Sequence, residues 1–164
     1  MRFAALRYRG EPMENQANLL DSILSVDNVL LDVNARGREE IFRVVAALWH
    51  QNNGLNEAEV AAGLEMREEL GSTGLGHGLA IPHARVKGLD KPLAAFVRLK
   101  NAIDFDAPDK EAVGDFFVLT VPSHATQIHL EILAEVAGKM SGTGFRDELR
   151  AAGSAAEVVR LFSA

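Results

Sequence analysis

Two apolar segments, residues 93–99 (LAAFVRL) and 115–121 (DFFVLTV), constrain the fold more than any other part of the chain. Their composition predicts strands, and each segment is too apolar for an exposed sheet edge. Residues 28–33 and 79–81 predict two shorter extended segments. Amphipathic helical segments alternate with these strands, and this alternation predicts an α/β domain in which helices cover a small mixed sheet.

Apolar residues recur at helical spacing in several parts of the chain. In the clearest case, residues 38–53, Ile41, Val45 and Trp49 belong to one stripe, and Gly54 is predicted to end the helix. Asn56 is a candidate N-cap for the next helix, which is predicted to stop at Gly71. We expect the methionine and aromatic positions to lie in the core. The other predicted helices cover residues 15–24, 123–140, 145–152 and 155–164.

The length of 164 residues predicts one domain, residues 15–164, preceded by an N-terminal extension, residues 1–14, that need not be ordered. The net charge of −6, from 17 basic and 23 acidic residues, argues against a nucleic-acid partner bound through bulk electrostatics. No apolar run approaches the ~20 residues that span a bilayer, so direct membrane insertion is not expected. The N-terminal residues make a poor signal peptide, which predicts a cytoplasmic protein. There are no cysteines, so thiolate metal sites are impossible.

Residues 71–86, GSTGLGHGLAIPHARV, concentrate the candidate chemistry. Pro82 has no N–H and a fixed φ, so we expect it to end strand pairing and to present His83 at a strand end. The glycine-rich loop can bring bare amides near an anion. A neutral histidine beside anion-holding donors is typical of phosphoryl transfer through phosphohistidine. The candidate donors are Arg67, Ser72, Thr73 and Gly74.

A second histidine, His129, lies in the opening turns of the helix after Pro122, where helix amides and an imidazole can face an anion. Taken alone, each position also has a purely structural interpretation. His83 and His129 can be ordinary structural or exposed residues, the glycines a tight loop, and Arg67 a helix C-terminal cation. The histidines at positions 50, 77 and 124 are interpreted as surface or loop residues.

Other chemistry is poorly supported. The glycines match neither a Walker A loop nor G-x-G-x-x-G, and no G-x-S-x-G motif occurs. The four histidines from position 77 to 129 lack the spacing of a zinc site, so no metal is expected.

The segment GSTGLGHGLAIPHARV resembles the active-site segment of fructose/mannitol-class enzyme IIA domains of the bacterial phosphoenolpyruvate–sugar phosphotransferase system. The family form, GSTG-[IL]-G-x-G-[IL]-A-[IL]-P-H, is matched throughout. The resemblance extends from about residue 19 to residue 162 and includes MREELGSTG and HLEILAEVA. It implies an EIIA type-2 domain over residues 15–164, with a mixed sheet of about five strands between helices.

The resemblance also implies roles for individual residues. His83 is then the residue phosphorylated by a histidine phosphocarrier protein of the HPr or NPr kind, His129 is the second active-site histidine, and Arg67 stabilises the charge. Neither a metal nor an organic cofactor is implied.

Within the family the chain looks most like the stand-alone nitrogen-regulatory enzyme IIA. That resemblance implies a regulator whose phosphorylation state controls targets such as potassium transport or nitrogen metabolism. Two features depart from that branch: His77 stands where asparagine is common, and PHARV replaces PHGKL. A sugar-specific enzyme IIA that passes phosphate to a IIB domain is therefore an alternative. A binding module that has lost phosphorylation is a third hypothesis.

Overall fold

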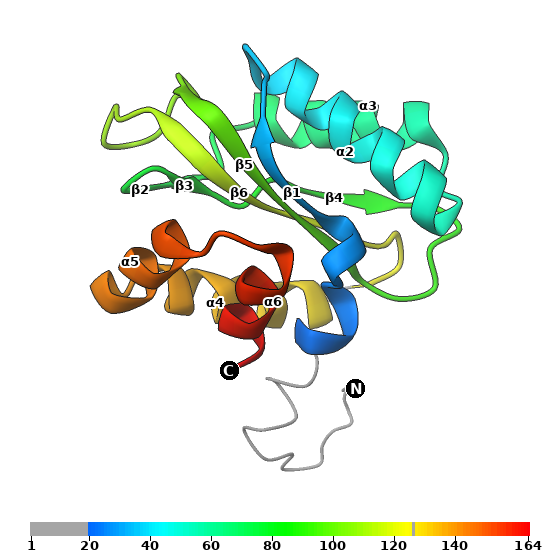
Figure 1. Ribbon diagram of the computed structural model, residues 1–164. Helices are drawn as coiled ribbons and strands as arrows, with labels where there is room; N and C mark the ends of the chain where they lie inside the picture. The colour runs from blue at the N-terminus through cyan, green and yellow to red at the C-terminus, as the bar shows by residue number, and fades with distance from the viewer. Residues whose placement is uncertain (1–19, 126) are drawn as a thin grey trace.

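The computed structural model describes residues 20–125 and 127–164. They form three layers, in which helices cover both faces of one six-stranded sheet (Figure 1). The expected α/β architecture with a mixed sheet is confirmed, and three of its strands have four residues or fewer. The proposed extension, residues 1–14, and most of the first predicted helix lie outside the described residues, and residues 20–23 are helical. The elements in chain order are η1 Val26–Asn28, β1 Val29–Val33, α2 Arg38–Asn53, α3 Glu57–Glu69, β2 Gly74–Gly76, β3 Leu79–Ala80, β4 His83–Val86, β5 Leu93–Ile103, β6 Val113–Pro122, α4 Ile128–Met140, α5 Thr143–Ala151 and α6 Ala155–Ser163.

The two apolar segments form the centre of the sheet. Strand β5 pairs antiparallel with β6, and β1 pairs parallel with the other edge of β5. The far edge of β6 is shared, because β3 pairs with its first half and β4 with its second half, both parallel. The β2 strand pairs with β3 and completes the sheet.

Helices α2 and α3 cover one face of the sheet, and α4, α5 and α6 cover the other (Figure 1). Each face has its own apolar core, represented by the fully buried Trp49 on one side and Phe162 on the other. The predicted helix boundaries on the first face are confirmed. Gly54 adopts a left-handed φ of 73° at the end of α2, and the Asn56 side chain accepts a hydrogen bond from the Glu59 N–H at the start of α3.

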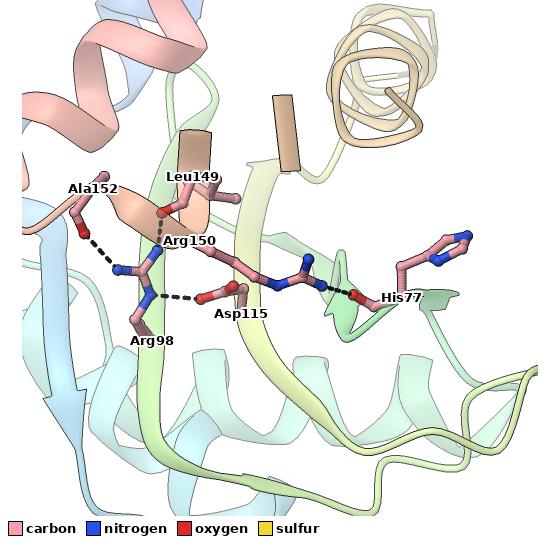
Figure 2. Close-up of polar contacts among 6 residues, drawn as sticks. All are labelled: His77, Arg98, Asp115, Leu149, Arg150 and Ala152. Carbon is pink, nitrogen blue, oxygen red and sulfur yellow. Dashed lines mark hydrogen bonds and ion pairs between the residues drawn. The ribbon is translucent and has the colours of Figure 1, made fainter. Parts of the chain in front are cut away.

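A buried ion pair ties the C-terminal helices to the sheet. Arg98 of β5 and Asp115 of β6 are 2.9 Å apart between Nε and Oδ1, with side-chain exposures of 18% and 10%. The same guanidinium donates to the carbonyl of Ala152 at 2.7 Å and to that of Leu149 (Figure 2). It therefore adds side-chain donors to carbonyls at the end of α5, where the backbone ladder of the helix stops.

The neighbouring Arg150 reaches away from α5 and donates from Nη2 to the His77 carbonyl at 2.6 Å (Figure 2). His77 lies in the turn between β2 and β3, with a φ of 58°, and its N–H donates to Asp109. The turn of the glycine-rich hairpin is thus held from two sides. Among the described helices, none is long and apolar enough to cross a membrane.

Candidate functional site

Strand pairing resumes immediately after Pro82, and this places His83. The Pro82 carbonyl accepts from the Leu119 N–H of β6 at 2.9 Å, and His83 is the first residue of β4, opposite Leu119. Pro82 thus separates β3 from β4 and places His83 at a strand end, as expected, but pairing with β6 resumes at His83 instead of ending. The missing N–H costs nothing here, because β4 is an edge strand that pairs only with β6 among the described strands.

His83 opens into a cavity of about 600 Å³ between α3, the free edge of β4 and α4. Arg67 of α3 and His129 of α4 line the same cavity, so three residues distant in the sequence are brought together as predicted. Arg85 also lines it, because alternate residues of a strand share a face.

The hydrogen bonds of His83 define its tautomer. Its Nδ1 lies 2.9 Å from the Ile81 carbonyl oxygen. A carbonyl only accepts, so Nδ1 carries the proton and Nε2 keeps its lone pair. Arg67 donates from Nε to that Nε2 at 3.3 Å, and its Nη1 donates to the Gly71 carbonyl at 2.8 Å. The guanidinium is thus fixed beside Nε2, the ring nitrogen that carries no proton.

Electrostatics keep His83 neutral. Burial lowers the pKa of His83 from its ordinary value of 6.5, the hydrogen bond to Ile81 opposes that effect, and the Arg67 guanidinium lowers the pKa further. The imidazole is therefore neutral at pH 7, with one proton on Nδ1, and its Nε2 is nucleophilic.

This pKa direction predicts the pH profile of phosphoryl uptake. Protonation consumes the Nε2 lone pair, so uptake is expected at pH values above the pKa of His83 and is lost as the pH falls through it. Because the pKa of His83 is lowered from its ordinary value of 6.5, the midpoint of this decline should lie below 6.5. Initial rates of uptake and an NMR titration of the His83 ring should share one midpoint. A midpoint above 6.5 would contradict the electrostatic account.

His129 is the second residue of α4 and is half-buried. Its Nε2 lies 3.5 Å from Nη2 of Arg85. Burial lowers the pKa of His129, and the charge of Arg85 lowers it further. Both imidazoles are therefore neutral in a pocket that already contains two guanidinium groups.

Arg85 was not predicted from the sequence. Its Nη1 donates to the carbonyls of Ser123, at 3.3 Å, and Ala125, both in the loop between β6 and α4. Neither Arg85 nor Arg67 has a carboxylate within ion-pair distance among the described residues. The alternation of side chains along β4 could have indicated Arg85, but only if a strand had been predicted to begin directly after Pro82.

The glycine-rich loop follows directly after α3, the helix that contains Arg67. The buried Glu68 accepts from the Thr73 N–H at 2.7 Å and from the Thr73 hydroxyl at 2.9 Å. The Ser72 hydroxyl donates to the Phe105 carbonyl and accepts from the Gly74 N–H. None of the three loop residues lines the cavity that His83 shares with Arg67. Their direct contact with a phosphoryl group stays a prediction, and in this conformation their contacts hold the loop.

Gly74 shows why the loop needs glycine at one position. A Cβ built there would lie 2.9 Å from the Ala107 Cβ, closer than such atoms approach. Glu68 was not predicted, because a glutamate inside a helix is ordinarily solvated.

Large apolar side chains surround the cavity. Met66 and Leu70 of α3 line it and are 68% and 86% exposed, and Leu130, next to His129, is 54% exposed. The expectation that all methionines lie in the core was wrong for Met66, which lies on the outer face of α3. Exposed apolar side chains around a reactive group are typical of a protein-docking surface.

The described residues contain no group of three or more histidine, aspartate or glutamate side chains that could hold a metal ion. The histidines at positions 50, 77 and 124 are exposed, as expected.

The site can be compared with known proteins. Residues 22–164 match the family described as "Phosphoenolpyruvate-dependent sugar phosphotransferase system, EIIA 2". The chain belongs to this EIIA family. Membership implies phosphoryl transfer through histidine and partners among phosphocarrier and IIB proteins, and the resemblance found in the sequence is confirmed.

Individual relatives agree with this assignment. The nitrogen regulatory protein of Pseudomonas aeruginosa is 36% identical over 143 residues, which cover 87% of this chain and 93% of the relative. The crystal structure of nitrogen regulatory protein IIA-Ntr from Neisseria meningitidis superposes with a TM-score of 0.84 at 39% identity, covering 88% of this chain and 99% of that one. A fructose-specific EIIA component of Haloferax volcanii is 36% identical over 83 residues, which cover 51% of this chain and 54% of the relative.

Proposed function

We propose that this EIIA protein accepts a phosphoryl group on Nε2 of His83 from a histidine phosphocarrier protein of the HPr or NPr kind. One observation carries the proposal: the Ile81 carbonyl holds the proton on Nδ1, so the lone pair of Nε2 faces the Arg67 guanidinium in the cavity. No other histidine in the described residues combines these two contacts.

The proposed step balances without a cofactor. The Nε2 lone pair of His83 is released from its hydrogen bond with Arg67 and forms the new N–P bond. The N–P bond of the donor breaks at the same time, and its electron pair returns to the donor imidazole. The His83 ring gains a positive charge, which the Nδ1–H bond to Ile81 stabilises. Arg67 compensates the charge of the transferring oxygens, as phosphoryl transfer requires.

The proposed output is regulatory. A phosphoryl group adds about 1.5 to 2 negative charges at pH 7 to a pocket whose two arginines have no carboxylate partner among the described residues. The exposed side chains of Met66 and Leu70, which line the pocket, would therefore lie beside a cationic centre in one state and a neutralised centre in the other. The relatives named nitrogen regulatory protein support targets in nitrogen metabolism. Potassium transport is a further proposed target, which rests on the family resemblance.

The second candidate function is sugar uptake, in which the same histidine would pass phosphate onward to a IIB domain. The fructose-specific relative supports this alternative, although the nitrogen regulatory relatives match far more of the chain. Rapid onward transfer to a sugar-specific IIB domain would favour it over the regulatory function.

Intact-mass spectrometry after incubation with phosphoenolpyruvate, enzyme I and a histidine carrier tests the proposal. We expect one acid-labile phosphate per chain. The same carrier must phosphorylate a known EIIA protein in a parallel reaction. Absence of phosphate under those conditions would overturn the proposal and favour the binding-module hypothesis.

Replacement of His129 by alanine is expected to slow phosphoryl uptake by about ten- to hundredfold. The imidazole supplies a polar contact beside the transferred group, and loss of such a contact to a charged group costs about 1.5–3 kcal/mol. Rapid-quench kinetics would measure the rate, and thermal unfolding should change little because His129 is only half-buried. Equal rates for His129→Ala and the wild type would exclude His129 from the mechanism.

A further inference from the structure

The loop that joins β6 to α4 is held by a side chain from the phosphorylation pocket. Arg85 donates from Nη1 to the carbonyls of Ser123 and Ala125. Within the same loop the Ala125 N–H donates to the Pro122 carbonyl at 3.0 Å, and Ala125 belongs to the buried apolar core on this face of the sheet. On the pocket side, the Arg85 guanidinium binds the carbonyls of the loop.

The position of Arg85 on β4 gives it access to a second partner. Residues two apart on a strand project from the same face, and their Cα atoms are about 6.6 Å apart, so Arg85 and His83 point into one cavity. His129 lines the same cavity, with its Nε2 3.5 Å from Arg85 Nη2, and burial together with the Arg85 charge lowers the pKa of His129. An anion built on Nε2 of His83 would thus form within the field of Arg85.

The two sets of partners differ in strength. In the unphosphorylated protein the acceptors of Arg85 are neutral carbonyls. Hydrogen bonds from a guanidinium to phosphoryl oxygens join two opposite charges and are frequently bidentate, whereas a neutral carbonyl offers neither the charge nor the paired acceptors. No carboxylate among the described residues lies within ion-pair distance of Arg85 to compete for it.

We propose that Arg85 exchanges partners when His83 is phosphorylated: it leaves the Ser123 and Ala125 carbonyls, binds the phosphoryl oxygens and thereby releases the loop between β6 and α4. This inference rests on the proposed function, because it requires the phosphoryl group on His83. Arg85 is then a positioning residue: when the pocket gains the negative charge of the phosphoryl group, Arg85 moves and the loop at the surface changes its conformation.

The consequence for recognition is specific. The loop leads directly into the first turn of α4, which presents the exposed Leu130 beside His129. Arg67 contacts only His83 and the adjacent Gly71 carbonyl among its described hydrogen-bond partners, so it has no equivalent link to this loop. A partner that binds the α4 side of the pocket would therefore distinguish the phosphorylated from the unphosphorylated protein by the conformation of this loop as well as by the charge of the pocket.

Hydrogen–deuterium exchange of the peptide containing residues 123–131 tests the exchange of partners. Wild type is compared with Arg85→Gln, Arg85→Lys and the control Lys87→Gln, which removes the same charge from an exposed position two residues along the chain. Each protein is measured before and after phosphorylation, and intact mass establishes the phosphate content. Because Arg85 is exposed, its replacement should leave the core folded.

In wild type and Lys87→Gln, phosphorylation should accelerate exchange in this peptide by about tenfold, equivalent to about 1.4 kcal/mol of lost protection. Arg85→Gln should exchange at the fast rate in both states, and Arg85→Lys should show an intermediate response. If phosphorylated wild type shows unchanged exchange, or if Arg85→Gln responds like wild type, the inference is overturned while the phosphocarrier function stands. If no phosphate is found on wild type, the proposed function fails and this inference fails with it.

Discussion

A His83→Asn variant is expected to accept no phosphate from a histidine carrier under conditions that fully phosphorylate the wild type. The substitution removes Nε2, the nitrogen that keeps a lone pair facing Arg67, and the asparagine amide nitrogen is not a nucleophile. Arg67 and His129 remain in place, so the loss tests the acceptor atom and not the assembly of the pocket. Phosphate content would be read by intact-mass spectrometry at neutral pH, which preserves phosphohistidine.

The matched control for this variant is His124→Asn, because His124 is exposed in the loop before α4. This variant should take up phosphate at nearly the wild-type rate. The backbone of His83 pairs with β6 whatever its side chain, so His83→Asn should unfold within about 1–2 kcal/mol of wild type. Wild-type phosphate uptake by His83→Asn would move the acceptor to another residue.

Replacement of Arg98 by methionine is expected to lower the free energy of unfolding by about 3–5 kcal/mol. The change leaves the Asp115 carboxylate, 10% exposed, without its partner. It also removes the donor for the Leu149 and Ala152 carbonyls at the end of α5. Burial already raises the pKa of Asp115, and the Arg98 hydrogen bond and charge oppose that effect, so the unpaired carboxylate is costly.

Denaturant unfolding would measure this effect against Arg160→Met, which removes an exposed arginine from α6. A double variant, Arg98→Met with Asp115→Leu, should recover part of the loss because the uncompensated charge is removed as well. Equal stability of Arg98→Met and Arg160→Met would show that the ion pair contributes nothing measurable.

Local signals in the sequence predicted much of the fold. Gly54 and Asn56 act within a few residues of their own positions, so their effect on helix ends can be inferred from the sequence. The central strands could be recognised because burial on both faces requires continuous apolar residues. The pairing around Pro82 could not be predicted in this way, because it depends on β6, more than 30 residues away. One edge of β6 pairs first with β3, before Pro82, and then with β4, after it.

The site shows the same division between local and long-range effects. Local sequence features made His83, Arg67 and His129 candidates, the family resemblance implied their roles, and the structure brings them to one cavity. Arg85 was missed because its role depends on carbonyls about 40 residues away, in the loop after β6. Glu68 was missed because a glutamate inside a helix is ordinarily solvated, and only the fold shows that both carboxylate oxygens are used by Thr73. No local pattern contains that information.

The nitrogen that carries the phosphate tests the central claim most directly. Protein labelled with ¹⁵N in histidine would be phosphorylated through the carrier, and the ¹⁵N–³¹P coupling would be observed by NMR. The contacts of His83 predict a single phosphohistidine in which phosphorus is coupled to Nε2, while Nδ1 keeps its proton and its bond to Ile81. Coupling to Nδ1 of His83, or to any nitrogen of His129, would contradict the account.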